Sequence, residues 1–182
     1  MREITQIRLA GFGGQGIVLA GMLLGFAGVR EGLEVANANS YGAQARGSAC
    51  KAEVILGRKS IVFPHVLTSD ILIVLSQEAY KLFLPDMADG GTILFDPYHV
   101  TPGKTPHTFH GIPATQTALK TFRTPQPANI VMLGAFTELT GIISEANMTA
   151  AIRENAPPRF VDANLKALAL GIDLAKKTKG AS

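Results

Sequence analysis

The chain has little of the residue types that carry redox and metal chemistry. Cys50 is the only cysteine among its 182 residues, and there is no tryptophan. A single cysteine cannot form an internal disulfide, build a cysteine-ligated zinc site or hold an iron–sulfur cluster. The four histidines follow no metal-ligand spacing. We therefore expect no metal site and no resident cofactor in this chain, and a reducing cytoplasm as its location.

Charge and long apolar runs are also scarce. Charged residues make up 17% of the chain, apolar residues make up 47%, and the net charge is +3. Average soluble domains are roughly 25% charged, so this composition favours a chain that buries extra surface against a partner subunit. The positive charges are spread out, and we expect no nucleic-acid binding. Glycine or charge breaks every apolar run well before about 18 residues, so we expect no membrane span.

Short apolar runs alternate with helical patterns along the chain. The predicted strands cover residues 7–10, 33–38, 50–56, 61–63, 71–75, 92–95 and 108–110. The predicted helices cover residues 17–29, 77–83, 113–122, 129–139, 145–154 and 159–177. This alternation predicts a three-layer α/β fold with a mostly parallel, Rossmann-like sheet and a helix-rich C-terminal third. We expect one domain over residues 1–182.

A run of six residues, Gly11-Phe12-Gly13-Gly14-Gln15-Gly16, follows the first predicted strand as a glycine loop and opens the first helix. Its Gly-x-Gly-x-x-Gly spacing is that of the dinucleotide fingerprint, in which backbone N–H groups and a helix N-terminus face a phosphate. The second strand, however, ends in Asn37-Ala38-Asn39, where an NAD site needs an acidic residue. The loop therefore predicts either a phosphate-bearing ligand or a backbone contact with a partner.

A second polar segment, residues 40–48, follows the second predicted strand and contains Tyr41, Gly42 and Arg46. Loops at the carboxyl ends of neighbouring parallel strands lie at one edge of a sheet, so we expect this segment and the glycine loop to form one surface. Arg46 can bind a phosphate or carboxylate there, or form a structural salt bridge. Tyr41 can contact a ligand or pack as a ring with its hydroxyl satisfied.

The remaining reactive side chains favour structural roles. Asp96-Pro97 is typical of a turn, Ser76 lacks a nucleophile elbow, and Cys50 is expected as a small core residue. We therefore predict no catalytic residue in this chain.

The glycine loop and the second polar segment together resemble the gamma subunit of 2-oxoacid:ferredoxin (acceptor) oxidoreductases, whose pattern reads G-x-G-G-Q-G and then S-Y-G-x-E-x-R-G-G. Residues 129–134, 164–167 and 71–79 are similar to that family as well. Gln44 stands where glutamate is common, which removes a carboxylate and keeps an acceptor. Ser48 stands where a second glycine is common.

The resemblance implies a non-cofactor subunit of a complex that oxidatively decarboxylates a 2-oxoacid to an acyl-CoA. Thiamine diphosphate and iron–sulfur clusters then belong to the alpha, beta and delta subunits, ferredoxin or a similar acceptor takes the electrons, and coenzyme A is the co-substrate. The gamma subunit is structural and helps to form the coenzyme A path. Its candidate binding residues are Gly11, Gly13, Gly14, Gln15, Gly16, Tyr41, Gly42 and Arg46.

Two alternatives stay open. One is the small subunit of an indolepyruvate oxidoreductase, which shares this domain. The other is a stand-alone nucleotide-binding Rossmann-like protein, a reading that depends on the glycine fingerprint only.

Overall fold

The computed structural model describes residues 3–40 and 49–179. Within these residues, six strands form one sheet in the order β2-β3-β1-β4-β5-β6. The strands are β1 (Ile4–Phe12), β2 (Glu34–Ser40), β3 (Ala49–Gly57), β4 (Ser69–Val74), β5 (Met87–Phe95) and β6 (Thr108–Gly111). Strands β1, β4, β5 and β6 run parallel, whereas β3 is antiparallel to both β1 and β2. The predicted mostly parallel sheet is confirmed, with β3 as its reversed strand.

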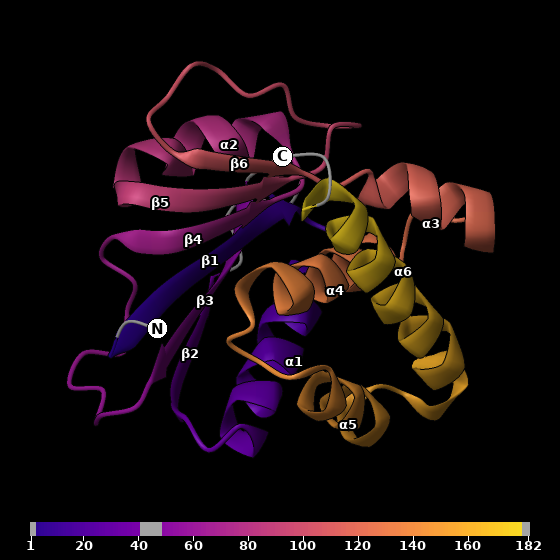
Figure 1. Ribbon diagram of the computed structural model, residues 1–182, viewed down its shortest axis with the longest axis horizontal. Coiled ribbons are helices and arrows are strands. Elements are labelled where there is room, and N and C mark those ends of the chain that lie inside the picture. Colours follow the sequence, from indigo (N-terminus) through magenta and orange to yellow (C-terminus); the bar gives the residue numbers. More distant parts are fainter. Residues whose placement is uncertain (1–2, 41–48, 180–182) are drawn as a thin grey trace.

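The helices of the described residues lie on both faces of this sheet. They are α1 (Ile17–Arg30), α2 (Gln77–Phe83), α3 (Ala114–Phe122), α4 (Ala128–Thr140), α5 (Glu145–Asn155) and α6 (Val161–Lys179), with 3-10 turns η1 (Leu84–Asp86) and η2 (Pro158–Phe160). In Figure 1, α2 lies on one face, and α1, α4, α5 and α6 gather on the other. The three layers and the helix-rich C-terminal third are confirmed. Every helix in this part of the chain is too short or too polar to cross a membrane.

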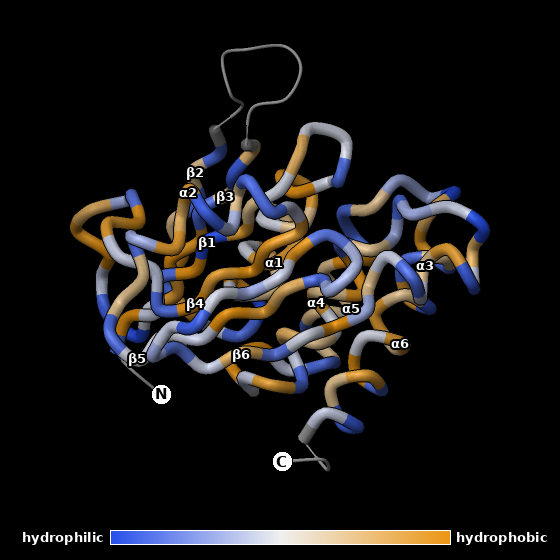
Figure 2. The backbone as a smooth tube through the Cα atoms, turned by 90° about the horizontal axis from the view of Figure 1, so that it is seen from above, coloured by the Kyte–Doolittle hydropathy of each residue, from blue (hydrophilic) through white to orange (hydrophobic). Residues whose placement is uncertain are grey.

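Two apolar cores fill the space between the layers. Alternate residues of a strand point to opposite faces, so Ile7 and Leu9 of β1 enter the larger core while Ala10 enters the smaller one beneath α2. Helix α4 runs through the larger core and is buried continuously from Ala128 to Thr137. In Figure 2, apolar residues concentrate along the central strands and hydrophilic ones gather toward the periphery. The buried central strands therefore support the end of the sheet where the glycine loop follows β1.

Small residues let α1 lie close to the sheet, as its composition predicts. A methyl group added at Gly21 would stand 2.5 Å from Cβ of Ala52, and one at Gly28 would stand 2.6 Å from a methyl of Leu56. Both neighbours belong to β3. Close packing of α1 on β3 therefore compensates for the low helix propensity of these glycines.

Glu31 joins the end of α1 to the start of α5. Its carboxylate accepts hydrogen bonds from the Ser144 N–H (2.9 Å) and hydroxyl (2.8 Å) and from the Asn147 amide (2.7 Å). Ser144 also caps α5, because its hydroxyl accepts the Asn147 N–H at 3.3 Å. Burial acts to raise the pKa of Glu31, but the hydrogen bonds from Asn147 and Ser144 outweigh it and hold the pKa below the ordinary value of 4.5.

The predicted hairpin strand at Ile61–Phe63 is wrong. Residues 60–63 belong to no strand, and the side chain of Val62 is 96% exposed. The reason is that β3 already pairs with β1 along one edge and with β2 along the other. A segment that follows β3 therefore finds no open edge on it.

Candidate functional site

The glycine loop is shorter than its sequence motif. Gly11 and Phe12 pair with β3 as the last residues of β1, so the prediction that they belong to the loop is corrected. The turn itself consists of residues 13–16. Gly14 (φ 94°) and Gly16 (φ 71°) adopt the left-handed backbone region that favours glycine. The strand–turn–helix placement of the motif is confirmed.

Gln15 fixes this turn to the neighbouring strand. Its Oε1 accepts the N–H of Phe12 at 2.6 Å, and its Nε2 donates to the carbonyl of Leu75, directly after β4, at 2.8 Å. A side chain at Gly11 would collide with Oε1 of Gln15. Gly11 is therefore required by the packing of Gln15, a reason that lies inside the protein.

Asn129 holds the other end of the turn from the first part of α4. Its Nδ2 donates to the carbonyl of Gly16 at 2.9 Å, while its Oδ1 accepts the N–H of Ile130 at 2.9 Å. A side chain at Gly16 would collide with this amide. The Asn129 residue is only 4% exposed, so the contact is a fixed part of the fold. The last glycine of the motif is thus also explained by an internal contact.

The start of α1 lacks a side-chain cap. Its N-cap residue is Gly16, and among residues 3–40 and 49–179 no side-chain cap hydrogen bond is present at this helix start. By contrast, the hydroxyl of Ser76 caps α2 by accepting the Ala79 N–H at 3.2 Å. The uncapped N–H groups carry the positive end of the helix dipole of α1, which is 14 residues long. A helix N-terminus of this kind favours a negative charge near it.

A cavity of about 360 Å³ adjoins the turn. It is lined by Gly14, Gln15, Leu75, Tyr98, His99 and Gln126, together with residues of α3 and of the start of α4. It lies where α1 leaves β1 toward one face of the sheet and α2 leaves β4 toward the other. Open α/β sheets bind ligands in the crevice at such a switch point. The described lining residues include no Asp, Glu, Lys or Arg, so the cavity suits an uncharged group.

Asp96 fixes two residues that line the cavity, Tyr98 and Thr115. Its buried carboxylate accepts the N–H of Tyr98 at 3.0 Å and the N–H of Thr115 at 2.7 Å. The predicted turn role of Asp96 is confirmed, and the same contacts fix Tyr98 and the start of α3. Cys50 is a buried core residue, as predicted, and its burial raises the pKa of its thiol.

Of the predicted site residues, Gly14 and Gln15 line the cavity. Tyr41, Gly42 and Arg46 lie outside the described residues, and their roles stay predictions. Sequence reasoning missed Tyr98, His99 and Gln126, which lie outside its predicted strands and helices. One signal for the first two was available, because they follow Asp96-Pro97 at the carboxyl end of a buried strand.

The turn, the uncapped helix and the cavity define a Rossmann-like α/β domain that presents backbone amides and an uncharged pocket at its switch point. Comparison with known proteins then identifies the family. Residues 6–174 match the family described as pyruvate ferredoxin/flavodoxin oxidoreductase, and the chain belongs to it. It is a gamma-type subunit of the 2-oxoacid:ferredoxin oxidoreductases, as its motifs predict.

Three relatives show the extent of this similarity. The 2-oxoglutarate synthase subunit KorC of Methanocaldococcus jannaschii is 43% identical over 94% of each chain. The gamma subunit of a keto/oxoacid ferredoxin oxidoreductase from Geobacter sulfurreducens superposes with a TM-score of 0.81 at 33% identity, covering 95% of this chain and 99% of that one. The 2-oxoglutarate:ferredoxin oxidoreductase of Magnetococcus marinus, solved with 2-oxoglutarate, coenzyme A and succinyl-CoA, gives 0.86 at 27% identity, covering 97% of this chain and 32% of that one.

The alternative within the class is less similar. The indolepyruvate oxidoreductase subunit IorB of Methanothermobacter thermautotrophicus is 25% identical over 94% of this chain. The comparisons therefore favour the branch of the family that contains the 2-oxoglutarate synthase subunits.

Proposed function

We propose that this gamma-type subunit belongs to a complex that acts on 2-oxoglutarate. The reaction converts 2-oxoglutarate and coenzyme A to succinyl-CoA, carbon dioxide and one proton, and two electrons pass to the acceptor. The observation that carries this choice is the 43% identity, over nearly the full length, to a subunit of a 2-oxoglutarate synthase. The 25% identity to an indolepyruvate oxidoreductase subunit supports that alternative less.

The cofactors of the complex belong to other subunits in this proposal. Thiamine diphosphate and the iron–sulfur clusters are held by the alpha, beta and delta subunits, and ferredoxin or a similar acceptor takes the electrons. The single cysteine supports this assignment, because Cys50 is buried in β3 and one thiolate cannot ligate a cluster. A reduced free thiol also fits a cytoplasmic location.

The contribution of this chain is to position coenzyme A. Coenzyme A carries phosphates at one part of the molecule and uncharged groups elsewhere, and the site offers both kinds of surface. The amides of Gly13 and Gly14 and the uncapped start of α1 suit a phosphate. The adjacent cavity suits an uncharged group, with Tyr98 and Gln126 as hydrogen-bonding side chains on its wall. Arg46 is the predicted cation of this site.

A reconstituted complex tests the proposal. The chain is co-produced with the candidate thiamine-binding and cluster-binding subunits, and acceptor reduction is measured with 2-oxoglutarate, pyruvate, 2-oxoisovalerate and indolepyruvate. We expect kcat/KM for 2-oxoglutarate to exceed that for the other acids by at least about 10-fold, which is about 1.4 kcal/mol of discrimination. A preference for another oxoacid would contradict the substrate assignment.

Two further results bear on the alternative of a stand-alone nucleotide-binding protein. Recovery of the native chain only as a free monomer, with no oxoacid oxidoreductase activity in any fraction, would contradict the subunit role. Calorimetry of the isolated chain with NAD, NADP, FAD and coenzyme A is the complementary experiment. Tight binding of a dinucleotide would favour the stand-alone protein.

A further inference from the structure

The start of β1 and the connection between β3 and β4 form an exposed apolar surface, which we call the amino-edge patch. It consists of Ile4, Val62, Phe63 and Leu67, whose exposed fractions are 38%, 96%, 52% and 69%. All four line one groove of about 220 Å³. The groove lies at the edge of the sheet where β1 begins, opposite the edge that carries the glycine loop. Apolar side chains gathered around a groove mark an interaction surface.

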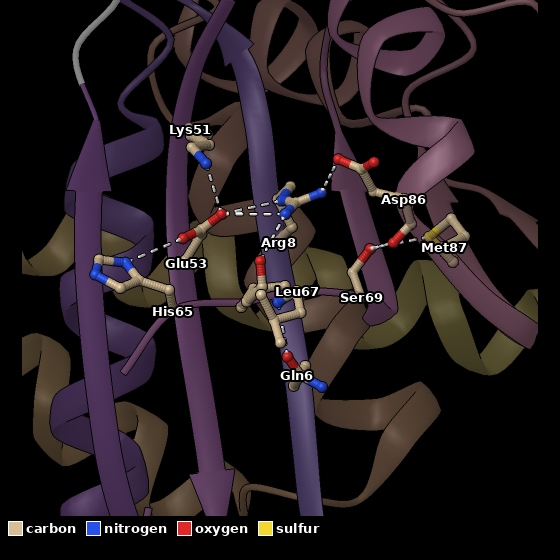
Figure 3. Close-up of polar contacts among 10 residues, drawn as sticks. Gln6, Arg8, Lys51, Glu53, His65, Leu67, Ser69, Asp86 and Met87 are labelled. Atoms are coloured by element: carbon tan, nitrogen blue, oxygen red, sulfur yellow. Dashed lines mark hydrogen bonds and ion pairs between the residues drawn. The ribbon is translucent and has the colours of Figure 1, made fainter. Parts of the chain in front are cut away.

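Polar contacts anchor the end of this connection, and Figure 3 shows Arg8, Gln6 and Leu67 among them. Arg8 donates to the carbonyl of Val66 at 3.0 Å, and the side chain of Gln6 accepts the N–H of Leu67 at 3.0 Å. Arg8 itself is only 3% exposed and is fixed by Glu53 at 3.1 Å. The apolar side chains are therefore displayed on an anchored segment, which reduces the ordering cost of binding a partner.

The charge beside the patch indicates what a partner must carry. Arg58 and Lys59 are both exposed at the start of the connection. Lys59 pairs with Glu3 at 2.6 Å, whereas the Arg58 side chain has no ion pair with any described residue. A partner that presents an apolar side chain to the groove and a carboxylate to Arg58 would complement this surface.

One comparison structure shows this fold as part of a longer chain. This chain covers only 32% of the Magnetococcus marinus chain that it matches. In that protein a domain of this fold is thus joined covalently to a longer remainder. Where the domain is a separate chain, as in the Geobacter sulfurreducens gamma subunit, contact with the remainder has to be made between subunits.

We propose that the amino-edge patch is the docking surface for the subunit that corresponds to this remainder. That subunit inserts an apolar side chain into the groove and places a carboxylate against Arg58. The inference depends on the proposed function, because it requires the assembled complex.

The first test uses the double variant Val62→Ser/Phe63→Ser in the reconstituted complex. The matched control is Phe160→Ser, since Phe160 is a half-exposed phenylalanine (43%) in η2, next to α6. We expect the double variant to bind the remaining subunits at least about 10-fold more weakly, with an unchanged Tm, and the control to stay within about twofold. Reversal of the charge in Arg58→Glu is expected to lower the association rate.

Site-specific crosslinking identifies the occupant. Because Cys50 is buried, a Val62→Cys variant offers a thiol that a photoreactive maleimide can label selectively. Crosslinking to the subunit that matches the remainder supports the inference, and crosslinking to a second copy of this chain or to another subunit contradicts it. Normal assembly of the double variant would overturn this inference alone. Failure of the wild-type chain to assemble would overturn the proposed function together with it.

Discussion

Gly13 is the position at which a small change separates ligand binding from folding. Its φ is not positive, and a methyl group added to it meets no atom within 4 Å. Alanine therefore fits the folded chain without strain. Because alanine also restricts the unfolded chain, Gly13→Ala is expected to raise the free energy of unfolding by about 0.4–1 kcal/mol.

The same methyl group stands on the backbone surface that we assign to a phosphate. If it displaces the phosphate from one or two amides, it removes charge-assisted hydrogen bonds worth about 1.5–3 kcal/mol each. We therefore expect the KM for coenzyme A to rise roughly 10- to 100-fold while the KM for the 2-oxoacid stays unchanged. The assay is steady-state acceptor reduction by the reconstituted complex over a range of coenzyme A concentrations.

Gly103→Ala is the matched control, since Gly103 also has an ordinary φ and open space around its Cα. Gly103 lies in the connection between β5 and β6. The KM of the Gly103→Ala complex for coenzyme A should match that of the wild type. An unchanged KM in an intact, thermally stable Gly13→Ala complex would refute the assignment of the loop to coenzyme A. Dissociation of the Gly13→Ala complex would instead show that the loop faces a partner subunit.

Three further predictions concern the scaffold. Glu53→Gln leaves the buried Arg8 without its main counter-ion and should cost about 3 kcal/mol in urea unfolding, whereas Glu3→Gln, at an exposed pair, should cost less than about 1 kcal/mol. The pKa of Glu31 is depressed in the folded state. The Glu31 carboxylate therefore stabilises the fold above pH 4.5, and this contribution is lost as the pH falls through the folded pKa. The stability gap between wild type and Glu31→Gln, followed by thermal unfolding, should therefore shrink in acid. Gly134→Ala forces a methyl group against a carbonyl of α6 and should lower the Tm, whatever the pH.

Much of the fold was predictable because local patterns decide it. The apolar run at 71–75 could only be a buried strand, and helix α2 has the predicted bounds because Ser76 caps its start. The reversed direction of β3 was not predictable from its own residues, because it depends on pairing with β1 and β2. The apolar residues 61–63 look like a strand in sequence and are exposed because no edge of β3 remains free.

The candidate site was only half predictable for a similar reason. The glycine motif is local, but the partners that explain it are not. Asn129 lies 113 residues from Gly16, and Leu75 lies 60 residues from Gln15. The cavity forms only when the ends of β1, β4 and β5 meet α3 and α4. A single sequence therefore indicates the glycine loop, but it does not identify the residues that line the cavity, such as Tyr98.

The most direct measurement is hydrogen exchange of the assembled complex with and without coenzyme A. The Gln15 amide donates to the carbonyl of Phe12 at 3.2 Å, but the other amides of residues 13–19, in the loop and the uncapped first turn of α1, should exchange quickly in the free complex. If the loop binds coenzyme A, coenzyme A slows the exchange of these amides and NAD does not. Unchanged exchange at residues 13–19 under saturating coenzyme A, in a complex that turns over, would contradict the account.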